Sequence, residues 1–310
     1  MAKYFSFLSI LVIFIGVVIA KHAFFDQSTR ICSWNIRFFG LKMENDVGTH
    51  SYFQYISNYL KELNPDILCL QEISSYESIL RLENMLNGYK LFVSDYTMEN
   101  NKKLIQEQGM ENLLSYIGDP SKDIGGLQFN VFLVRNNIKV IDFHTVHRKM
   151  ICLNYKDKHT GQPFTIYNCH FPSDFSGDKT GERSKTIMSL FRDIKKHNYK
   201  NIVIAGDLNT EKKRGELTSL DNKFVDVFNT PLASNRHIGL SPIYTHRWER
   251  GNSQHPYLPD KYSHIDYFFV SRRILNRVKD VFVDTTFCGE NLGTLMSDLS
   301  DHCAIVMDFI

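Results

Sequence analysis

"NIVIAGDLNT", residues 201–210, is an apolar run that ends at Gly206 and is followed by a carboxylate, Asp207, and an amide, Asn209. Short runs rich in Val and Ile that are bounded by turn-forming residues are typical of buried strands. Because side chains alternate along an extended chain, Asp207 and Asn209 face the same side. An aspartate in this place is by itself more often a turn former. The stretch predicts a buried strand that ends beside two polar side chains.

Similar runs recur along the chain, rich in Val, Ile, Phe, Tyr and Cys and bounded by Gly, Pro, Asn or Asp. They are residues 30–39, 66–73, 89–95, 129–135, 164–171, 201–209, 264–271 and 301–309. Residues 52–63 and 184–197 instead have apolar residues at three- and four-residue spacing, which predicts helices. Strands of both alternating and continuous apolar character, separated by few helices, predict an α/β fold of two stacked mixed sheets with helices outside.

One domain over residues 30–310 is predicted, because no linker, internal repeat or low-complexity tract interrupts the pattern. The polar segment 100–123 contains one amphipathic stretch. We expect this segment to lie on the surface as an insertion or a lid.

The first twenty residues differ from the rest, since residues 4–20 contain no charged side chain. Their length lies between that of a signal-peptide apolar region and that of a bilayer-spanning helix. Residues 1–20 are therefore a secretory signal peptide or an N-terminal membrane anchor, and the cleavage-like sequence ending at Ala20 favours the signal peptide. We expect a secreted or periplasmic protein, with membrane association through residues 4–20 as the alternative.

The charge balance excludes a strongly basic, electrostatic nucleic-acid binder. The chain has 36 basic and 34 acidic residues and a net charge of +2, so any nucleic acid would need a local cationic patch. Some basic residues either form such a patch or merely face solvent. These are Arg183, Lys212, Lys213, Arg214, Arg247 and Arg250.

The six cysteines do not form the spacing pattern of a disulfide framework or a zinc knuckle. Buried free cysteine behaves as a small apolar side chain. We therefore predict core thiols at Cys32, Cys69, Cys169 and Cys303, while a disulfide of Cys152 or Cys288 stays open.

Polar or protonatable side chains recur at the ends of the predicted strands. Neighbouring strands would bring these ends to one rim of the sheets, where hard cations such as Mg²⁺ take carboxylate and amide oxygens. A histidine beside such an ion can take a proton from water, and a second can protonate a leaving oxygen. The candidates are Asn35, Glu72, Asp95, His170, Asp207, Asn209, Asp266, Asp301 and His302.

The order of these motifs carries a family resemblance. "SWNIRFFG", "DILCLQE", "NCHFPSD", "IAGDLNT", "SHIDYFFVS" and "SDHCAI" follow one another within residues 31–306. In this order they resemble the endonuclease/exonuclease/phosphatase superfamily. Within it, "NIRFFGLKM" and "FVSD" are most similar to secreted deoxyribonuclease of the pancreatic type. The resemblance implies a four-layer α/β/β/α sandwich and Mg²⁺- or Mn²⁺-dependent hydrolysis of phosphodiesters.

The resemblance also implies a metal and phosphate site. Glu72 matches the metal-binding glutamate and Asn35 the asparagine that supports it. Asp207 and Asn209 match the pair that holds the scissile phosphate and the metal, and Gly206 would let the chain turn close to that phosphate. Asp301 matches a second metal ligand or a carboxylate of the phosphate site.

Two histidines match the proton-transfer groups of the superfamily. His302 matches the base that activates water, and Asp266 the carboxylate that orients it, an arrangement that fixes the tautomer of the imidazole. His170 matches the histidine that faces the leaving group, with Asp95 as its acidic partner.

Several departures bear on the substrate. Ser74 stands where the pancreatic branch carries an arginine for the DNA minor groove, and no calcium-loop or disulfide pattern of that branch is evident. The stretch 243–248, "IYTHRW", resembles the strand that presents an aromatic side chain to substrate, although Trp248 could equally belong to the core.

The first hypothesis is an exported, monomeric, metal-dependent endonuclease that acts on DNA or another phosphodiester. The alternative is a sphingomyelinase-like or phosphoinositide phosphodiesterase or phosphatase that acts at membranes. Such an enzyme would need an exposed aromatic hairpin, and only residues 109–116, "GMENLLSY", suggest one. A binding protein without activity is disfavoured, because no catalytic position is lost.

Overall fold

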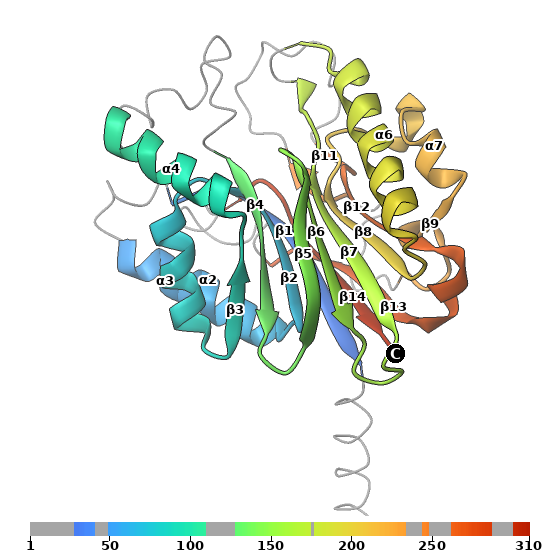
Figure 1. Cartoon of the computed structure of the whole chain (residues 1–310), viewed down its shortest axis with the longest axis horizontal. Coiled ribbons are helices and arrows are strands. Elements are labelled where there is room, and N and C mark those ends of the chain that lie inside the picture. Colours follow the sequence, from blue (N-terminus) through green and yellow to red (C-terminus); the bar gives the residue numbers. More distant parts are fainter. Residues whose placement is uncertain are drawn as a thin grey trace, which may run out of the picture.

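Two six-stranded sheets lie face to face with helices on their outer sides (Figure 1). The structure is a computed structural model. It describes residues 28–40, 49–109, 128–174, 177–233, 244–247, 262–286 and 300–310. The predicted leader, residues 1–20, lies outside this part of the chain. The arrangement confirms the predicted four-layer α/β/β/α sandwich.

The first sheet has the order β13-β14-β1-β2-β4-β3. Strands β1 and β2 run parallel, and the other neighbours are antiparallel. The strands are β1 (Thr29–Phe39), β2 (Ile67–Ile73), β3 (Tyr89–Phe92), β4 (Phe129–Arg135), β13 (Val278–Asp284) and β14 (Ala304–Phe309).

The second sheet has the order β5-β6-β7-β8-β12-β9. Only β7 and β8 are parallel neighbours in it. The strands are β5 (Lys139–His147), β6 (Met150–Lys156), β7 (Pro163–His170), β8 (Ile202–Asp207), β9 (Phe224–Asp226) and β12 (Asp266–Ser271). A separate two-stranded ribbon consists of β10 (His246–Arg247) and β11 (Tyr262–Ser263).

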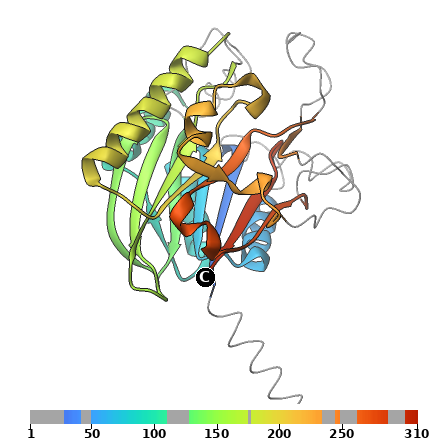
Figure 2. The ribbon, with the colours of Figure 1, turned by 90° about the vertical axis from the view of Figure 1, so that its right-hand side faces the viewer.

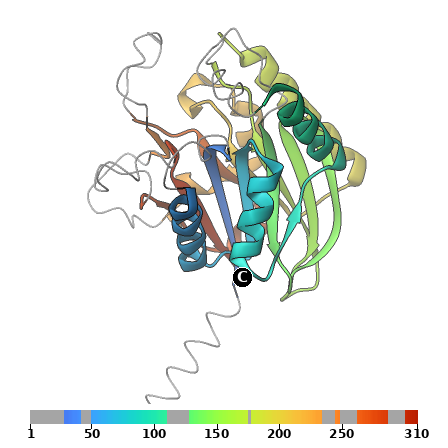
Figure 3. The same cartoon turned by 90° about the vertical axis from the view of Figure 1, so that its left-hand side faces the viewer.

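Helices cover the outer face of each sheet. On the first sheet lie α2 (Thr49–Leu63) and α3 (Tyr76–Leu86), followed by α4 (Asp95–Gln108) (Figure 3). On the second lie α6 (Thr180–His197) and α7 (Thr218–Asp221) (Figure 2). Short 3₁₀ helices are η2 (Lys212–Arg214), η3 (Val227–Asn229) and η4 (Arg272–Arg277). Helices α2 and α6 confirm the two predicted helical patterns.

Three apolar layers join the four structural layers. The central one fills the space between the sheets, and the outer ones lie between each sheet and its helices. In β2, Cys69 belongs to the central layer while Leu68 and Leu70 belong to an outer layer. A strand buried on both faces has a continuous apolar run, and each buried leucine contributes about 1.5–3 kcal/mol to stability.

The cysteines are corrected at one position. Cys32, Cys69, Cys152 and Cys169 are free and buried. Cys303 is disulfide-bonded, so its prediction as a core thiol is wrong. The disulfide partner of Cys303 lies outside the described residues, and Cys288 also lies outside them. The apolar sequence around Cys303 did not show whether this cysteine is a free thiol or part of a disulfide, because both forms are apolar and can be buried.

No helix in the described ranges is both long enough and apolar enough to span a membrane.

Candidate active site

The strand register of the second sheet brings three polar side chains together. Asp207, the last residue of β8, is the register partner of His170 in β7 on one side and of Asp266 in β12 on the other. Partners on neighbouring strands project from the same face of a sheet. The ends of β7, β8 and β12 therefore form one wall of the candidate site.

The first sheet supplies the opposite wall through Asn35 of β1 and Glu72 of β2. The Asn35 amide Nδ2 donates to Glu72 Oε1 and to Asp207 Oδ2, at 3.0 Å each. Its Oδ1 accepts from the backbone N of Arg37 at 3.1 Å. One fully buried amide thus joins the two sheets and lies between two carboxylates.

An irregular backbone aims Glu72 at the site. Its φ of 58° lies in the left-handed region, and the pairing of β2 shifts register here with both of its neighbours. Such a conformation costs about 1–3 kcal/mol and is tolerated where surrounding contacts enforce it, while a bulge redirects a side chain. Gln128 Nε2 holds the other carboxylate oxygen at 2.7 Å.

The acidic side chains fit a hard divalent cation. One donor atom each from Glu72, His170 and Asp207 lies within 4.8 Å of the others. Burial raises the pKa of Asp207 to about 7, with the charges of Asp266 and Glu72 adding to the effect and that of His302 opposing it. A cation bound by these oxygens would relieve this accumulation of negative charge.

His302 and Asp266 form a buried dyad. His302 Nδ1 lies 2.9 Å from Asp266 Oδ2, and its Nε2 lies 3.7 Å from Asp207 Oδ2. Burial lowers the pKa of His302, but the charges of Asp266 and Asp207 outweigh burial and raise the pKa to about 10. A base must be neutral, and a cation at Asp207 would lower this pKa by offsetting the carboxylates.

His170 has the opposite electrostatic setting. Its Nε2 lies 3.6 Å from Glu72 Oε1 and 3.9 Å from Asp207 Oδ2. Burial lowers its pKa well below the usual value, and the charges of Lys149 and His302 lower it further. Two histidines whose pKa values are pushed apart at one site are typical of acid–base pairs.

Asn209 lies directly after β8 and contacts Asp207 twice. Its backbone N donates to Asp207 Oδ1 at 2.8 Å, and its Nδ2 donates to Oδ2 at 3.1 Å and to the Phe171 carbonyl at 2.9 Å. Its φ is 49°. The pair forms an Asx-type turn and also borders the site. The turn-forming role and the site role that the sequence suggested are therefore compatible.

Asp301 lies near Nε2 of His302, the nitrogen that also lies near Asp207. Its Oδ2 is 3.3 Å from Arg37 Nε and 3.7 Å from His246 Nε2, and its Oδ1 is 3.9 Å from His302 Nε2. Burial raises the pKa of Asp301, but the hydrogen bond from His246 and the nearby positive charges lower it overall. Asp301 is thus placed as a carboxylate beside the dyad.

Asp95 is not brought to His170. It is exposed and is the first residue of α4, where Ser94 caps the helix. No hydrogen bond or ion pair within the described ranges joins Asp95 to His170. An acidic side chain in the first turn of a helix interacts favourably with the helix dipole, which accounts for an aspartate here without a role at the site.

The basic residues considered as a possible cationic patch are largely paired within the chain, where the structure describes them. Arg183 is fully buried and contacts Asp174 and Glu216. The other described pairs are Lys212 with Asp221 and Asp226, Lys213 with Glu211, and Arg214 with Asp174. Arg250, Trp248 and the side chain of Arg247 lie outside the described residues, as does most of residues 109–116.

Gly206 makes a close backbone contact in addition to its predicted place beside a phosphate. Its φ is 131°, and a Cβ here would lie 2.0 Å from the Cys169 carbonyl oxygen. The close approach is therefore to the neighbouring strand β7. Glycine is required for β7 and β8 to pair beside the site.

The sequence reasoning missed several residues that support the site. Asn168 Nδ2 donates to the Leu70 and Val131 carbonyls, which fixes the second sheet to the first. The His246 ring lies 4.5 Å from that of His302. Asn168 precedes His170 by two residues, so the two-residue strand period could have identified it. His246 lies in the stretch 243–248, whose aromatic candidate for a substrate contact was Trp248.

Comparison with known proteins agrees with this geometry. Residues 32–302 match the model of the Endonuclease/Exonuclease/phosphatase family. An endonuclease/exonuclease/phosphatase from Bacteroides vulgatus is similar in structure, with a TM-score of 0.60 and 17% identity over 91% of this chain and 98% of that one. No curated protein matches the sequence.

Two solved structures of TDP2 have the same fold. Truncated Caenorhabditis elegans TDP2 has a TM-score of 0.60 and 16% identity over 91% of this chain and 98% of that one. D. rerio TDP2, complexed with a single-strand DNA product, has a TM-score of 0.56 and 17% identity over 92% and 99%. The particular similarity to pancreatic-type deoxyribonuclease stays a prediction. The family match over most of the chain, together with the convergent strand ends, shows that the chain belongs to the endonuclease/exonuclease/phosphatase family and is a metal-dependent phosphodiester hydrolase.

Proposed function

We propose that this protein is an exported endonuclease that hydrolyses DNA phosphodiester bonds with Mg²⁺ or Mn²⁺ by attack of a histidine-activated water. The observation that carries this function is the meeting of the buried His302–Asp266 dyad with the carboxylates of Glu72 and Asp207. In-line hydrolysis of a phosphodiester needs a base close to a group of oxygen atoms that can bind a cation.

The chain's own groups divide the work. Asp266 accepts a hydrogen bond from Nδ1–H of His302 and so leaves Nε2 unprotonated to take a proton from the attacking water. His170, at the end of β7, donates a hydrogen bond to an oxygen of the phosphate on the leaving-group side. Asn35 holds Glu72 and Asp207 in position. A divalent ion held by Glu72 and Asp207, with Asp301 as a further carboxylate nearby, would supply charge neutralisation for the phosphate.

A DNA substrate is supported by the solved structure of D. rerio TDP2 with a single-strand DNA product. Cationic side chains at the site are Arg37, beside Asp301, and Lys149, whose carbonyl accepts from the His170 backbone N and whose charge acts on His170. Phosphate contacts by such side chains position a nucleic acid without selecting its sequence.

The alternative substrate is a phospholipid or phosphoinositide headgroup at a membrane. One observation favours it: the described members of the candidate cationic patch are paired within the protein, namely Arg183, Lys212, Lys213 and Arg214. Less cationic surface then remains for a DNA backbone.

Export and a monomeric state belong to the same proposal. Residues 1–20 have the composition of a signal peptide, and an uncleaved anchor through residues 4–20 is the alternative. Fractionation of cells that express the full chain, with N-terminal sequencing of the product, distinguishes a processed soluble protein from a membrane-bound one.

The substrate is tested with the purified protein on plasmid DNA, sphingomyelin and a phosphoinositide, with Mg²⁺, Mn²⁺ or EDTA. We expect metal-dependent cleavage of DNA that EDTA abolishes. Turnover of either lipid with none of DNA would replace the nuclease function by the membrane one.

A further inference from the structure

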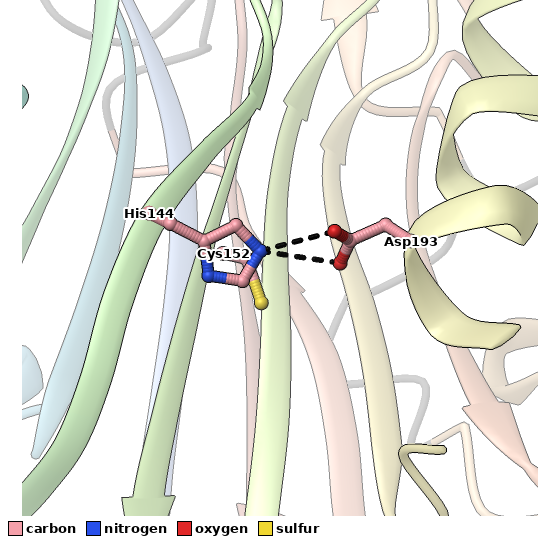
Figure 4. Close-up of side chains that lie close together, drawn as sticks. All are labelled: His144, Cys152 and Asp193. Atoms are coloured by element: carbon pink, nitrogen blue, oxygen red, sulfur yellow. Dashed lines mark hydrogen bonds and ion pairs between the residues drawn. The ribbon is translucent and has the colours of Figure 1, made fainter. Parts of the chain in front are cut away.

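A second cluster of metal-binding side chains lies away from the active site. His144 of β5 is the register partner of Cys152 in β6, and Asp193 reaches them from α6 (Figure 4). His144 Nε2 lies 3.1 Å and 3.3 Å from the two oxygens of Asp193. One donor atom from each residue lies within 4.8 Å of the others.

This cluster and the active site are on opposite faces of the second sheet. In β7, Tyr167, the register partner of Cys152, and Cys169 belong to the apolar layer under α6. Asn168 bonds the first sheet, and His170 lines the active site. Because side chains alternate along a strand, residues that face α6 cannot reach the active site. A function of the cluster is therefore independent of phosphodiester hydrolysis.

The donors suit Zn²⁺ better than Mg²⁺. A thiolate, an imidazole and one carboxylate are typical zinc ligands, whereas Mg²⁺ prefers oxygen alone. Zn–N and Zn–S bonds of about 2.0–2.3 Å place tetrahedral ligand atoms roughly 3.3–3.7 Å apart. The 3.1 Å between His144 Nε2 and Asp193 Oδ1 is close to such an edge. The Cys152 sulfur lies within 4.8 Å of both atoms and would move toward them when an ion binds.

The surrounding contacts orient the donors. His144 Nδ1 lies 3.1 Å from Asp142 Oδ2. If Nδ1–H donates to this carboxylate, as in many metal-binding histidines, Nε2 is free to bind metal. In that tautomer the Nε2 lone pair faces the Asp193 carboxylate, which is repulsive unless a cation lies between them. Tyr167 Oη donates to Asp193 Oδ2 at 2.8 Å and holds that carboxylate in place.

We propose that His144, Cys152 and Asp193 bind a Zn²⁺ ion that fixes α6 to β5 and β6, with water in the fourth position. Binding releases the Cys152 thiol proton to solvent, and the thiolate and carboxylate then balance the charge of the ion. The His144 side chain is 25% exposed, which gives the ion a path to the buried thiol. The alternative is a cluster held by hydrogen bonds alone, with His144 in contact with Asp142 and Asp193 and no ion between them.

Cobalt substitution separates these two states. The purified full chain, with its active site saturated by excess Mg²⁺, is titrated with Co²⁺ and followed by near-ultraviolet thiolate-to-cobalt absorption. We expect one equivalent to bind and Zn²⁺ to displace it. Cys152→Ala should lose the absorption, while Cys69→Ala, which removes another buried free thiol, should keep it. No thiolate absorption in the wild-type chain, or its survival in Cys152→Ala, would overturn the proposal.

Two milder variants guard against loss of folding. His144→Gln removes a partly exposed ligand and should lower Co²⁺ affinity more than Asp142→Asn, which removes only the orienting carboxylate and should cost about 10- to 100-fold. Zn²⁺ should raise the melting temperature of the wild type and not that of His144→Gln. Equal Zn²⁺ effects on both would leave hydrogen bonding as the sole role of the cluster. Mg²⁺-dependent hydrolysis should be unchanged in each variant.

Discussion

At the scale of single residues, the role of each buried carboxylate in the site depends on the group with which it forms its hydrogen bond. Asp266 and Asp207 are both almost fully buried, yet Asp266 contacts His302 at 2.9 Å while Asp207 contacts the amide of Asn35 at 3.0 Å. A carboxylate that contacts an imidazole fixes its tautomer, and one that accepts a hydrogen bond from an amide still has lone pairs with which to bind a cation. Two chemically identical side chains on neighbouring strands thus have different predicted roles.

The dyad predicts the effect of Asp266→Asn. An amide at this position cannot hold the Nδ1–H tautomer of His302 in the same way, so we expect kcat to fall by about 10²- to 10⁴-fold with little change in KM. Steady-state hydrolysis of a phosphodiester measures both constants. Asp142→Asn, far from the dyad, serves as the matched control. A wild-type kcat in Asp266→Asn would remove the dyad from the mechanism.

Gly206 gives a second prediction at this scale. In Gly206→Ala the new Cβ would lie 2.0 Å from the Cys169 carbonyl oxygen, so β7 and β8 would have to separate. We expect a loss of about 2 kcal/mol or more in the free energy of unfolding, measured by urea denaturation. Gly181→Ala in α6, where a Cβ meets nothing within 4 Å, should leave stability unchanged or slightly raised. Equal losses in the free energy of unfolding for Gly206→Ala and Gly181→Ala would show that the contact between residue 206 and β7 does not determine stability.

At the scale of elements, buried ion pairs hold the loop after β7 against α6. Arg183 in α6 donates to the Pro172 carbonyl at 2.9 Å and to Asp174 at 2.8 Å, and also to Glu216. This loop follows His170 directly. The fully buried arginine therefore positions the backbone beside the site rather than contacting a substrate from the surface.

Arg183→Ala should be strongly destabilising, because it removes the buried partner of the Glu216 carboxylate and leaves that carboxylate only the longer contacts with Arg214 and Thr180. We expect a loss of about 3–5 kcal/mol in the free energy of unfolding. Lys213→Ala, whose side chain is 63% exposed in its ion pair with Glu211, should cost less than about 1 kcal/mol. Chemical denaturation of both variants measures the difference, and similar losses would contradict the buried network.

The elements that sequence alone could predict are those buried on both faces. Residues 129–135 coincide with β4, whose first six residues are all buried. By contrast β5 is an edge strand with mostly exposed or half-buried residues, so it lacks the apolar run that identifies a strand. The run predicted to Asp95 ends at Phe92 because Ser94 caps α4. Helix α3 was missed although its buried Ile79, Leu82 and Leu86 have helical spacing.

The site residues could likewise be predicted where they end buried strands, and could not be predicted where their position depends on tertiary packing. His170, Asp207 and Asp266 end strands that pair in register, so their positions in the sequence already indicated their meeting. Asp95 also ends an apolar run, but a helix cap follows it, and its exposure depends on packing that a local pattern does not encode. The cluster of His144, Cys152 and Asp193 joins an edge strand to a helix, and no sequence spacing indicates it.

At the scale of the whole molecule, burial of neutral histidines makes stability depend on pH. Burial lowers the pKa of His264, whose ring stacks on Tyr267 at 4.5 Å. The unfolded chain then binds a proton near pH 6.5 that the folded chain resists, so this contribution to stability is present above pH 6.5 and is lost as pH falls below it. The raised pKa of Asp207 acts in the opposite direction below pH 7, and bound Mg²⁺ should suppress that opposition.

His264→Phe isolates the effect. Compared with the wild type in Mg²⁺, this variant should lose less stability between pH 6.5 and 5, by up to about 1.4 kcal/mol per pH unit. Urea denaturation at a series of pH values measures it. The exposed His159→Ala should retain the wild-type slope. Parallel curves for the wild type and His264→Phe would mean that His264 takes up its proton in the folded state.

The central claim, that the convergent strand ends hydrolyse phosphodiesters, is tested most directly by Mg²⁺-dependent cleavage of plasmid DNA with four proteins: the wild type, His302→Ala, His170→Ala and His159→Ala. We predict cleavage by the wild type and by His159→Ala, abolition by EDTA, and rates lower by at least about 10²-fold in the other two variants. Wild-type rates in both His302→Ala and His170→Ala would contradict the assignment of this site.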